Sequence, residues 1–576
     1  MADPQEILAQ RVQRALVAAF GEEEAGTDAV IRPSQFADYQ SNVALALGKR
    51  HGRPPRVVAA ELAEQLDVGD ICVATEVSGP GFINFSLRED WIASQADLLL
   101  TDERLGIPAS ARPQTIVVEY SSPNVAKEMH VGHLRTTIVG DSIARVMDVL
   151  GHRVIRDNHV GDWGTPYGML IEHLLEVGEH SAQAGLLETD PNTFYQAARQ
   201  KFDADPAFAE RARERVVLLQ GGDAETIRLW QELVDLSREY LRRTYARLGV
   251  TLTDADIRGE SFYNDLLAGT VAELAAKGIA VESHGALCAF PPGFTGREGE
   301  PLPVIIRKSD GAYNYSTTDL AAIRYRVDQL HVERAIYVVG ASQALHFQMV
   351  FAVARQAGWI PEGARFEHAQ IGDVLGPDGK ILRTRAGKSI KLREFLDEAV
   401  ERAGQVIADR YEDPQVRAQI AAAVGIGALK YADLSVARDS GYVFDFDRML
   451  ALTGNTAPYL QYAAARIRSI FRRDDSDADK AAGPMILHEH AERALALRLL
   501  DFGTAVQQVG ETAEPHRLCA YLFGVASAFT TFYEQCPVLG APSEAVKESR
   551  LALSALTLRV LLTGLGLLGV QVPDRM

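Results

Sequence analysis

The segment Thr115-Ile-Val-Val-Glu-Tyr-Ser-Ser-Pro-Asn-Val-Ala-Lys-Glu-Met-His-Val-Gly-His133 decides the fold of this 576-residue chain. Its first six residues form a short, β-branched, continuous run, which is typical of a buried parallel strand. Apolar residues at helical spacing then predict a helix from His133 to Leu150, ended by Gly151. Val154-Ile155 begins another strand. Strand, loop, helix and strand make a βαβ unit, so we expect an α/β, Rossmann-like, doubly wound sheet.

Three domains are expected around this unit, because the chain is too long for one compact core. Residues 1–112 are predicted to form an N-terminal α+β domain, and residues 101–113 are predicted to form the linker to the next domain. Residues 113–409 are predicted to form the α/β domain, with a helical insertion at about 160–300 and a second strand-and-helix region from Val304. From 410 to 576 the pattern is almost entirely helical, which predicts an all-α helix bundle.

Composition narrows the class of protein. No stretch of about 18 uncharged apolar residues occurs, and the N-terminus lacks the pattern of a secretory signal. The four cysteines are scattered, so neither a zinc site nor a disulfide framework is supported, and a reducing cytoplasm fits best. The net charge of −18 argues against non-specific coating of nucleic acid. Two basic segments, 374–393 and 455–473, are compatible with a polyanion bound at defined places.

The loop after Tyr120 carries a candidate nucleotide site. Lys127, His130, Gly132 and His133 stand where the predicted helix begins. A helix N-terminus attracts phosphate through its free N–H groups and its dipole, and a glycine admits close approach. The alternative is that two surface histidines and a glycine happen to begin a helix, but the position after a buried strand weakens that interpretation.

A candidate site for a cationic substrate lies in Asp310-Gly-Ala-Tyr-Asn-Tyr-Ser-Thr-Thr-Asp319. Tyr315 and Asp319 are four residues apart at the start of a helix predicted over 320–330, so both can face one pocket. A carboxylate there suits a planar guanidinium. However, Ser316-x-x-Asp319 is also a capping-box pattern, and spacing alone favours capping.

A third candidate surface lies in the helical region. Tyr459, Tyr462 and Arg466 recur at i, i+3 and i+7, which places two aromatic rings and a guanidinium on one helix face. Single-stranded RNA is recognised by stacking on such groups. Aromatic residues at helical spacing more often belong to the core, and the pattern alone favours that alternative.

These segments resemble one family. His130-Val-Gly-His133 resembles the HIGH signature of class I aminoacyl-tRNA synthetases, and the string from Glu119 to Arg135 resembles the arginyl-tRNA synthetases in particular. The second class signature, KMSKS, has its place taken by Gly379-Lys-Ile-Leu-Arg-Thr-Arg-Ala-Gly387. Ile381 stands where the first lysine would be. Many arginyl enzymes lack that lysine, and in them a lysine just before HIGH is thought to compensate, a role that Lys127 matches.

The resemblance implies a set of site residues. Catalysis and ATP binding are expected from Lys127, His130, Gly132, His133, Lys380, Arg383 and Arg385. Arginine binding is expected from Glu119, Ser121, Ser122, Asn124, His133, Tyr315, Asp319 and Gln343. Contacts with tRNA are expected from Tyr459, Tyr462, Arg466, Tyr533 and Met576 in a helical anticodon-binding domain, and from Phe82 and Asn84 in an N-terminal domain that touches the tRNA elbow.

The resemblance also implies a reaction. Arginine and ATP form arginyl-adenylate and pyrophosphate, and tRNA(Arg) then takes the arginyl group; members of the family usually need tRNA even for activation. We expect Mg²⁺ with the ATP, no protein-bound metal, no editing site, no membrane or DNA partner, and a cytoplasmic monomer. Two rivals stay open: a paralogue that makes arginyl-adenylate for another acceptor, and a catalytically inactive tRNA-binding protein.

Overall fold

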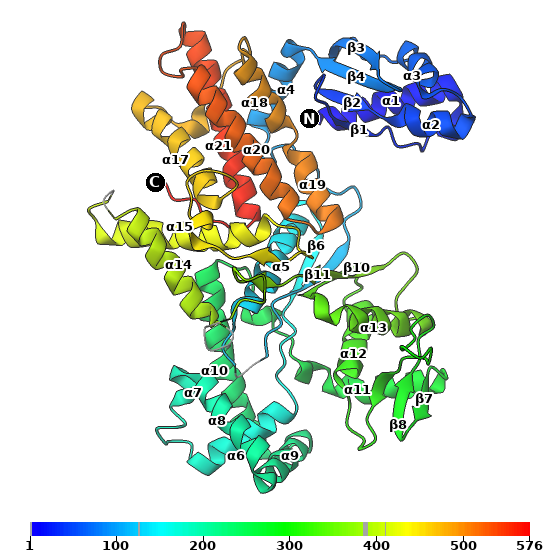
Figure 1. The fold of residues 1–576 in the computed structure, drawn as a ribbon, viewed down its shortest axis with the longest axis vertical. Helices are drawn as coiled ribbons and strands as arrows, with labels where there is room; N and C mark the ends of the chain where they lie inside the picture. The colour runs from blue at the N-terminus through cyan, green and yellow to red at the C-terminus, as the bar shows by residue number, and fades with distance from the viewer. Residues whose placement is uncertain (1–2, 125–126, 384–389, 409–410) are drawn as a thin grey trace.

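A parallel sheet lies at the centre of the molecule (Figure 1). The computed structural model describes residues 3–124, 127–383, 390–408 and 411–576. The sheet has four strands in the order β11-β10-β5-β6. Their bounds are β5 Thr115–Glu119, β6 Arg153–Asp157, β10 Arg334–Gly340 and β11 Arg365–Ile371. The chain leaves β5 toward one edge and β10 toward the other, so the topological switch point lies between the carboxyl ends of these two strands.

Helix α5 (Val131–Val149) confirms the predicted strand, helix and strand. The helix ends at Leu150, and Gly151 follows with a positive φ of 85°, a conformation that glycine adopts without steric cost. A second glycine, Gly140, lets the helix approach the sheet closely. A Cβ at that position would lie 2.2 Å from the Cβ of Tyr120, so no larger residue fits there without displacing the strand end.

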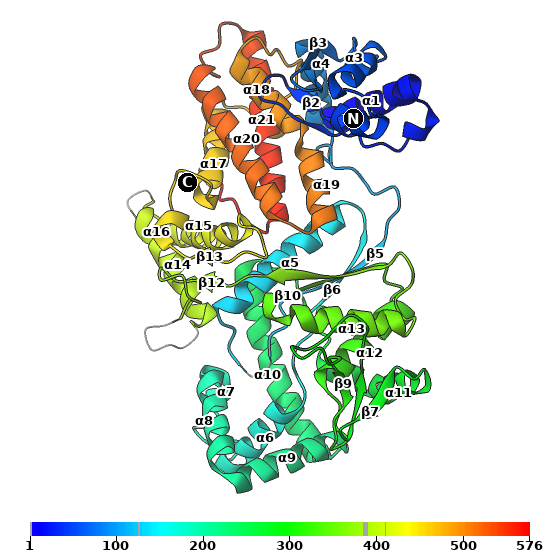
Figure 2. The same cartoon turned by 45° about the vertical axis from the view of Figure 1, so that its right-hand side comes forward.

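The insertion begins after β6 and forms the lower end of the molecule (Figure 2). Its helices are α6 Thr165–Val177, α7 Leu186–Thr189, α8 Pro191–Ala204, α9 Pro206–Gln220, α10 Ala224–Leu248 and α11 Asn264–Ala276. An antiparallel sheet of β7 (Ala280–Ser283), β8 (Ala286–Ala289) and β9 (Val304–Arg307) follows. The strand that begins at Val304 therefore belongs to this small sheet and not to the central one. Its alternating burial, with Val304 and Ile306 inside, suits a sheet that is covered on one face.

Three helices return the chain to the central sheet: α12 (Tyr315–Asp328), α13 (Ala344–Gln356) and α14 (Leu392–Val406). The predicted start of the first one was wrong, because α12 begins at Tyr315 and not at 320. Thr317 is fully buried, and its hydroxyl donates to the carbonyl of Ile306 on β9. That bond satisfies a side chain which would otherwise compete with the helix for backbone partners.

The N-terminal region is a small α+β unit (Figure 1). Helices α1 Pro4–Phe20, α2 Val43–His51 and α3 Pro55–Glu64 accompany an antiparallel sheet in the order β1-β2-β4-β3, whose strands are β1 Ile31–Pro33, β2 Tyr39–Ser41, β3 Cys72–Ser78 and β4 Phe82–Leu87. Helix α4 (Glu89–Thr101) leaves this unit and packs on α18 and α21 of the bundle. Arg493 of α18 reaches back to Asp38 at 2.6 Å, so the two parts are tied by a charged pair as well.

The C-terminal region is a helix bundle, as predicted. It comprises α15 Pro414–Leu434, α16 Phe446–Met449, α17 Ala457–Asp474, α18 His490–Leu500, α19 Phe502–Thr512, α20 His516–Gln535 and α21 Glu544–Leu567, with one short strand, β13 (Tyr442–Val443), paired to β12 (Val374–Leu375). Helix α21 is long and apolar enough to cross a bilayer, but 78% of its apolar window is buried in the bundle, as for a core helix.

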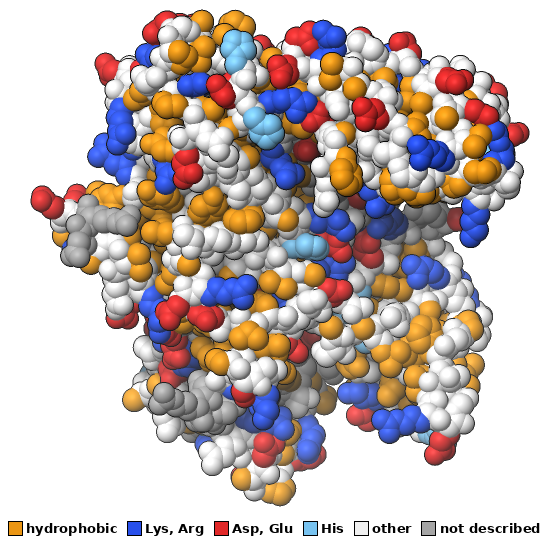
Figure 3. Space-filling model, turned by 45° about the horizontal axis from the view of Figure 1, so that its top comes forward, with side chains coloured by type: hydrophobic (Ala, Val, Ile, Leu, Met, Phe, Trp, Pro, Cys, Tyr) orange, Lys and Arg blue, Asp and Glu red, His pale blue; other side chains and the backbone are white. Residues whose placement is uncertain are grey.

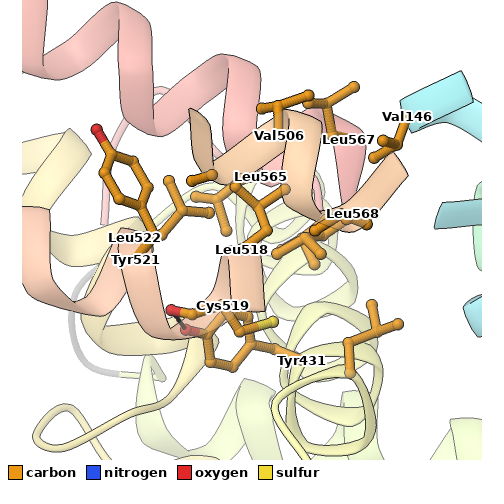
Figure 4. Close-up of a cluster of buried hydrophobic side chains, with 14 of the residues drawn as sticks. Val146, Tyr431, Val506, Leu518, Cys519, Tyr521, Leu522, Leu565, Leu567 and Leu568 are labelled. Atoms are coloured by element: carbon orange, nitrogen blue, oxygen red, sulfur yellow. Dashed lines mark hydrogen bonds between the residues drawn. The ribbon is translucent and has the colours of Figure 1, made fainter. Parts of the chain in front are cut away.

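A continuous apolar core joins this bundle to the central sheet. Figure 4 shows Val146 of α5 close to Leu567 and Leu568, at the end of α21, and to Val506 of α19. Tyr431 of α15 lies in the same cluster, and its hydroxyl donates to the carbonyl of Cys519 at 2.9 Å. Because these side chains interlock, the bundle and the HIGH-like helix α5 pack as one body.

Charged side chains are interspersed over the face shown in Figure 3, where no single field of one sign dominates. The net charge of −18 is therefore not gathered into one acidic patch on this face. Any recognition of a polyanion must come from local groups, whose positions are given below.

Candidate active site

A cavity of about 160 Å³ opens at the switch point of the central sheet. It lies between the first turn of α5 and the segment that replaces KMSKS. Its walls include His130, Gly132, Gly340, Asp373 and Ile381. This is where an open α/β sheet binds its ligands, beyond the carboxyl ends of its strands.

The two signature histidines are held in one protonation state. The backbone N–H of Gly132 donates to Nδ1 of His130 at 3.0 Å, and the N–H of His130 donates to Nδ1 of His133 at 3.1 Å. Burial, with a smaller contribution from Lys127, lowers the pKa of His130, and burial together with the charges of His130 and Lys127 lowers the pKa of His133 to about 3. Both rings are therefore neutral at pH 7 with Nδ1 accepting, so each carries its proton on Nε2, ready to donate to a phosphate oxygen.

Lys127 lies in the loop just before this turn, but its ammonium group contacts the helical insertion. Its Nζ lies 4.1 Å from the ring centroid of Tyr195 on α8, a cation–π contact with the insertion. Lys127 and Asn124 line the rim of a larger cavity of about 690 Å³, which extends between α10 and α14 and also has Arg243 and Arg393 in its walls. Lys127 is close enough to His130 and His133 for its charge to lower their pKa values, but it lines the larger cavity and not the one at the switch point.

The KMSKS-like segment forms a tight turn beside the smaller cavity at the switch point. The N–H of Gly376 donates to the carbonyl of Lys380 at 2.7 Å, and Leu375 and Ile381 form a bridge. Lys380, Ile381 and Arg383 are exposed, with 51% of Ile381 accessible. The expected ligand Arg385 lies outside the described residues.

The residues expected at the amino-acid end surround the end of β5. Ser121 and Ser122 both adopt positive φ, 71° and 45°, which is uncommon for residues other than glycine and concentrates at functional sites. The Ser121 hydroxyl is bonded to the Tyr245 hydroxyl at 2.8 Å, so it holds the loop. Ser122 Oγ is buried without a partner among the described residues and is free for a ligand. Asn124 is exposed and rests against Gly161, where a Cβ would lie 2.5 Å from its Oδ1.

Two of the residues expected to bind the guanidinium of arginine, Tyr315 and Asp319, lie close together, because both contact His346. Asp319 Oδ2 is 2.6 Å from Nε2 of His346, and the Tyr315 ring lies 4.9 Å from the His346 ring. Gln343 stands three residues before His346, exposed at the start of α13. Asp319 lies within α12, whose N-cap is Asn314, so it does not cap the helix and the capping-box alternative is wrong.

A second carboxylate was missed by the sequence analysis. Glu260 lies close enough to Asp319, Asp162 and His159 to feel their charges. Burial, together with Asp319 and Asp162, raises the pKa of Glu260 to about 7, although His159 opposes the shift. A carboxyl group with a pKa near neutrality suits a cationic ligand, because a bound cation favours the ionised form of the carboxyl. No periodicity marks Glu260, since it begins a single short 3-10 turn, Glu260–Tyr263, between α10 and α11.

The candidate RNA-binding residues of α17 divide into two groups. The Arg466 guanidinium lies 4.8 Å from the Tyr462 ring and 5.0 Å from the Tyr533 ring of α20. Together they form a partly exposed platform. Tyr459 instead packs on α20, where its hydroxyl is 3.0 Å from that of Thr530, so its contacts are those of a structural residue.

The remaining candidates lie apart from the catalytic cavity. Phe82 begins β4 and is partly exposed, whereas Asn84 is buried and donates to the Ser78 hydroxyl at 2.9 Å. Met576 packs on a small cluster of α14 and α15 side chains that includes Ala403 and Ile420.

Comparisons with known proteins identify the family. The chain matches the family model "tRNA synthetases class I (R), catalytic domain" over residues 95–446, the "DALR anticodon binding domain" over 460–576 and the "Arginyl tRNA synthetase N terminal domain" over 6–87. It is 64% identical to the arginine–tRNA ligase of Thermobifida fusca, with all of both chains covered, and 48% identical to that of Edwardsiella ictaluri, with 99% of this chain and 100% of the relative covered.

Solved structures agree over the whole length. The crystal structure of arginyl-tRNA synthetase from Plasmodium falciparum has a TM-score of 0.85 at 28% identity, and that from Thermus thermophilus has 0.83 at 26%. Each comparison covers 100% of both chains. The order and extent of the three matched domains, together with the HIGH-like turn at the switch point, lead to one conclusion: this chain belongs to the class I arginyl-tRNA synthetases.

Proposed function

We propose that this protein ligates arginine to tRNA, the activity of its family, and we assign a role in that reaction to each site residue. In the first step an oxygen of the arginine carboxylate attacks the α-phosphorus of ATP. The new P–O bond replaces the bond to the β-phosphate, so pyrophosphate leaves and arginyl-adenylate remains. In the second step the terminal adenosine hydroxyl of tRNA attacks the arginyl carbonyl, and AMP leaves. One observation supports this assignment most strongly. The structure has a turn with two neutral histidines, His130 and His133, and, separate from it, a site with the carboxylates Asp319 and Glu260 that suits a guanidinium.

For the nucleotide we propose His130, Gly132, His133 and Lys127 on one side, and Lys380, Arg383 and Arg385 on the other. The Nε2–H groups of the two histidines donate to phosphate oxygens without adding charge, and the cations compensate charge on the departing pyrophosphate. ATP binds as its Mg²⁺ complex, with the cation carried on the phosphates as substrate. Positioning and charge stabilisation supply the catalysis, with no covalent enzyme intermediate.

For arginine we propose two ends of one pocket. Asp319, Tyr315 and Gln343 receive the guanidinium, with Glu260 as a further carboxylate near it. Glu119, Ser122, Asn124 and His133 receive the amino-acid end, while Ser121 supports the loop that presents them. A pocket with partly buried carboxylates discriminates, because a near-cognate side chain leaves those groups unpaired.

For tRNA we propose that residues 410–576 bind the anticodon loop and that residues 1–112 touch the elbow, with 113–409 as the catalytic domain. Tyr462, Arg466 and Tyr533 form the stacking platform, and Tyr459 and Met576 support the bundle. Phe82 contacts the elbow, while the buried Asn84 holds the strand that carries Phe82. We further propose that the enzyme works as a cytoplasmic monomer. The paralogue with another acceptor and the inactive binding protein are not supported, since the full-length relatives are arginine–tRNA ligases.

Aminoacylation of tRNA transcripts, assayed with each amino acid in turn, tests the assignment. Arginine should be incorporated into tRNA(Arg) alone. Lysine should fail, because an ammonium cannot form the planar, forked contacts of a guanidinium. Equal charging with lysine, or no charging with arginine, would refute the proposal.

Arg466→Ala tests the stacking platform. Removing the guanidinium takes away a cation that can stack on a base or contact phosphate, so KM for tRNA should rise about tenfold or somewhat more, since stacking is worth about 1–3 kcal/mol per base. KM for arginine and ATP, measured at saturating tRNA, should stay within about twofold. Arg473→Ala, at the end of the same helix, is the matched control. An unchanged KM for tRNA would remove Arg466 from the interface.

A further inference from the structure

A buried ionic cluster lies behind the amino-acid end of the pocket. Arg326 of α12 is 0% exposed, and its Nη2 donates to Glu119 Oε2 at 2.5 Å and to Asp157 Oδ2 at 3.1 Å. Its guanidinium also lies 4.9 Å from the ring of Tyr337. These partners form one row across the sheet, because Glu119 of β5 is in register with Tyr337 of β10 and with Asp157 of β6.

This cluster is costly for the fold. The Nε and Nη1 atoms of Arg326, the Oδ1 of Asp157 and the Tyr337 hydroxyl are buried without a partner among the described residues. An ion pair at such depth rarely repays its desolvation, and apolar residues of similar volume often replace one without loss of stability. The arrangement therefore calls for an explanation beyond folding.

The protonation state of Glu119 supplies that explanation. Burial raises the pKa of this carboxyl above its usual value, and Arg326 is the strongest influence that opposes the rise. His159 also lowers it, whereas Asp157 and Asp319 raise it. Two further groups, the Tyr337 and Tyr263 hydroxyls, face the same carboxylate as neutral phenols. Without the guanidinium, Asp157 and Asp319 would raise the pKa of Glu119 with only the weaker opposing effect of His159 against them.

We infer that Arg326 is a positioning residue for arginine activation, which keeps Glu119 ionised and oriented toward the α-ammonium group of the substrate. The inference rests on the proposed role of Glu119. It also links the two ends of the pocket. Asp319 and Arg326 are seven residues apart on α12, which places them on one face of a single rigid helix. The helix that receives the guanidinium thus also supports the carboxylate that receives the ammonium.

Steady-state pyrophosphate exchange with tRNA present tests this. In Arg326→Gln, KM for arginine should rise about tenfold or more at about pH 6.5, because Glu119 becomes protonated, while KM for ATP moves by less than about twofold. Raising the pH should restore binding by up to about tenfold per unit while Glu119 ionises. Arg326→Lys keeps the charge and should recover much of the affinity. Arg324→Gln, two residues earlier on α12 and paired with Glu273, is the matched control and should behave as the parent enzyme.

Two further variants keep the test decisive. In a Glu119→Gln background, Arg326→Gln should add no pH dependence, since the group that titrates is gone. If Arg326→Gln is too unstable to assay, Arg326→Gln with Asp157→Asn removes one unpaired buried carboxylate and should also show a pH-dependent KM, with its midpoint at lower pH because Asp157 no longer raises the pKa of Glu119. A pH profile of the Arg326→Gln variant parallel to that of the parent enzyme would overturn the inference. If Glu119→Gln itself leaves KM for arginine unchanged, the proposed role of Glu119 fails instead.

Discussion

Replacing Asp319 with asparagine should lower kcat/KM for arginine by about 10³-fold. The amide keeps the shape of the side chain but loses the charge that faces the guanidinium. Removing one member of a buried, hydrogen-bonded charge pair costs about 2–5 kcal/mol, and each 1.4 kcal/mol is a factor of ten. Pyrophosphate exchange at varied arginine concentration measures the effect, and the loss should fall mainly on KM for arginine.

The control for this change lies on the same helix. Asp328 is the last residue of α12 and is exposed, so Asp328→Asn should leave the kinetics within about twofold. His346 Nε2 lies 2.6 Å from Asp319 Oδ2, and the asparagine can keep a hydrogen bond to this ring through its amide oxygen. If Asp319→Asn lowers kcat/KM by less than about tenfold, or raises KM for ATP as much as KM for arginine, the guanidinium site lies elsewhere.

The sequence predicted the parts of this molecule that are coded locally. The strand at 115–119, the helix that follows it and Gly151 at its end each carry a signal within a few residues. The placement of His130 and His133 at the helix start follows from the same signals, because a strand that ends in a buried sheet must deliver its loop to the ligand edge. The resemblance then placed Tyr315 and Asp319 in one pocket, and the structure brings both beside His346.

Features that depend on register between distant strands were not predictable. Arg326 meets Glu119 and Asp157 only because β5 and β6 align these carboxylates in one row, and no spacing along the chain encodes that. Glu260 was missed for the same reason, since only the folded loop brings it near Asp319. The start of α12 was misjudged because Thr317 resembles a capping or turn residue until β9 supplies the carbonyl that its hydroxyl bonds.

Lys127→Ala should lower kcat for pyrophosphate exchange by about 10²–10³-fold, with KM for arginine changed much less. Both signature histidines are neutral in the structure, because burial lowers their pKa values, so they donate hydrogen bonds but supply no charge. Ile381 stands where a lysine would otherwise face the phosphates. Losing one preorganised donor to the charge that develops in the transition state typically costs 10²–10³ in kcat. Lys127→Arg, which keeps the charge, should retain more activity than the alanine variant.

The decisive variant restores a lysine at position 381, where the class signature has one. If Lys127 compensates for Ile381, then Ile381→Lys in the Lys127→Ala background should recover about tenfold or more of the lost kcat, whereas Ile381→Lys alone should gain little. Tyr195→Phe is the control for the cation–π contact of Lys127. It keeps the aromatic ring, whose centroid lies 4.1 Å from Lys127 Nζ, so kcat should stay within about twofold of the parent value. The two positions lie on different segments, Lys127 in the loop before α5 and Ile381 in the turn after β12, so rescue would require that both side chains reach the same phosphates. Failure of the rescue, with Lys127→Ala still inactive, would place Lys127 in a role other than replacing the missing lysine.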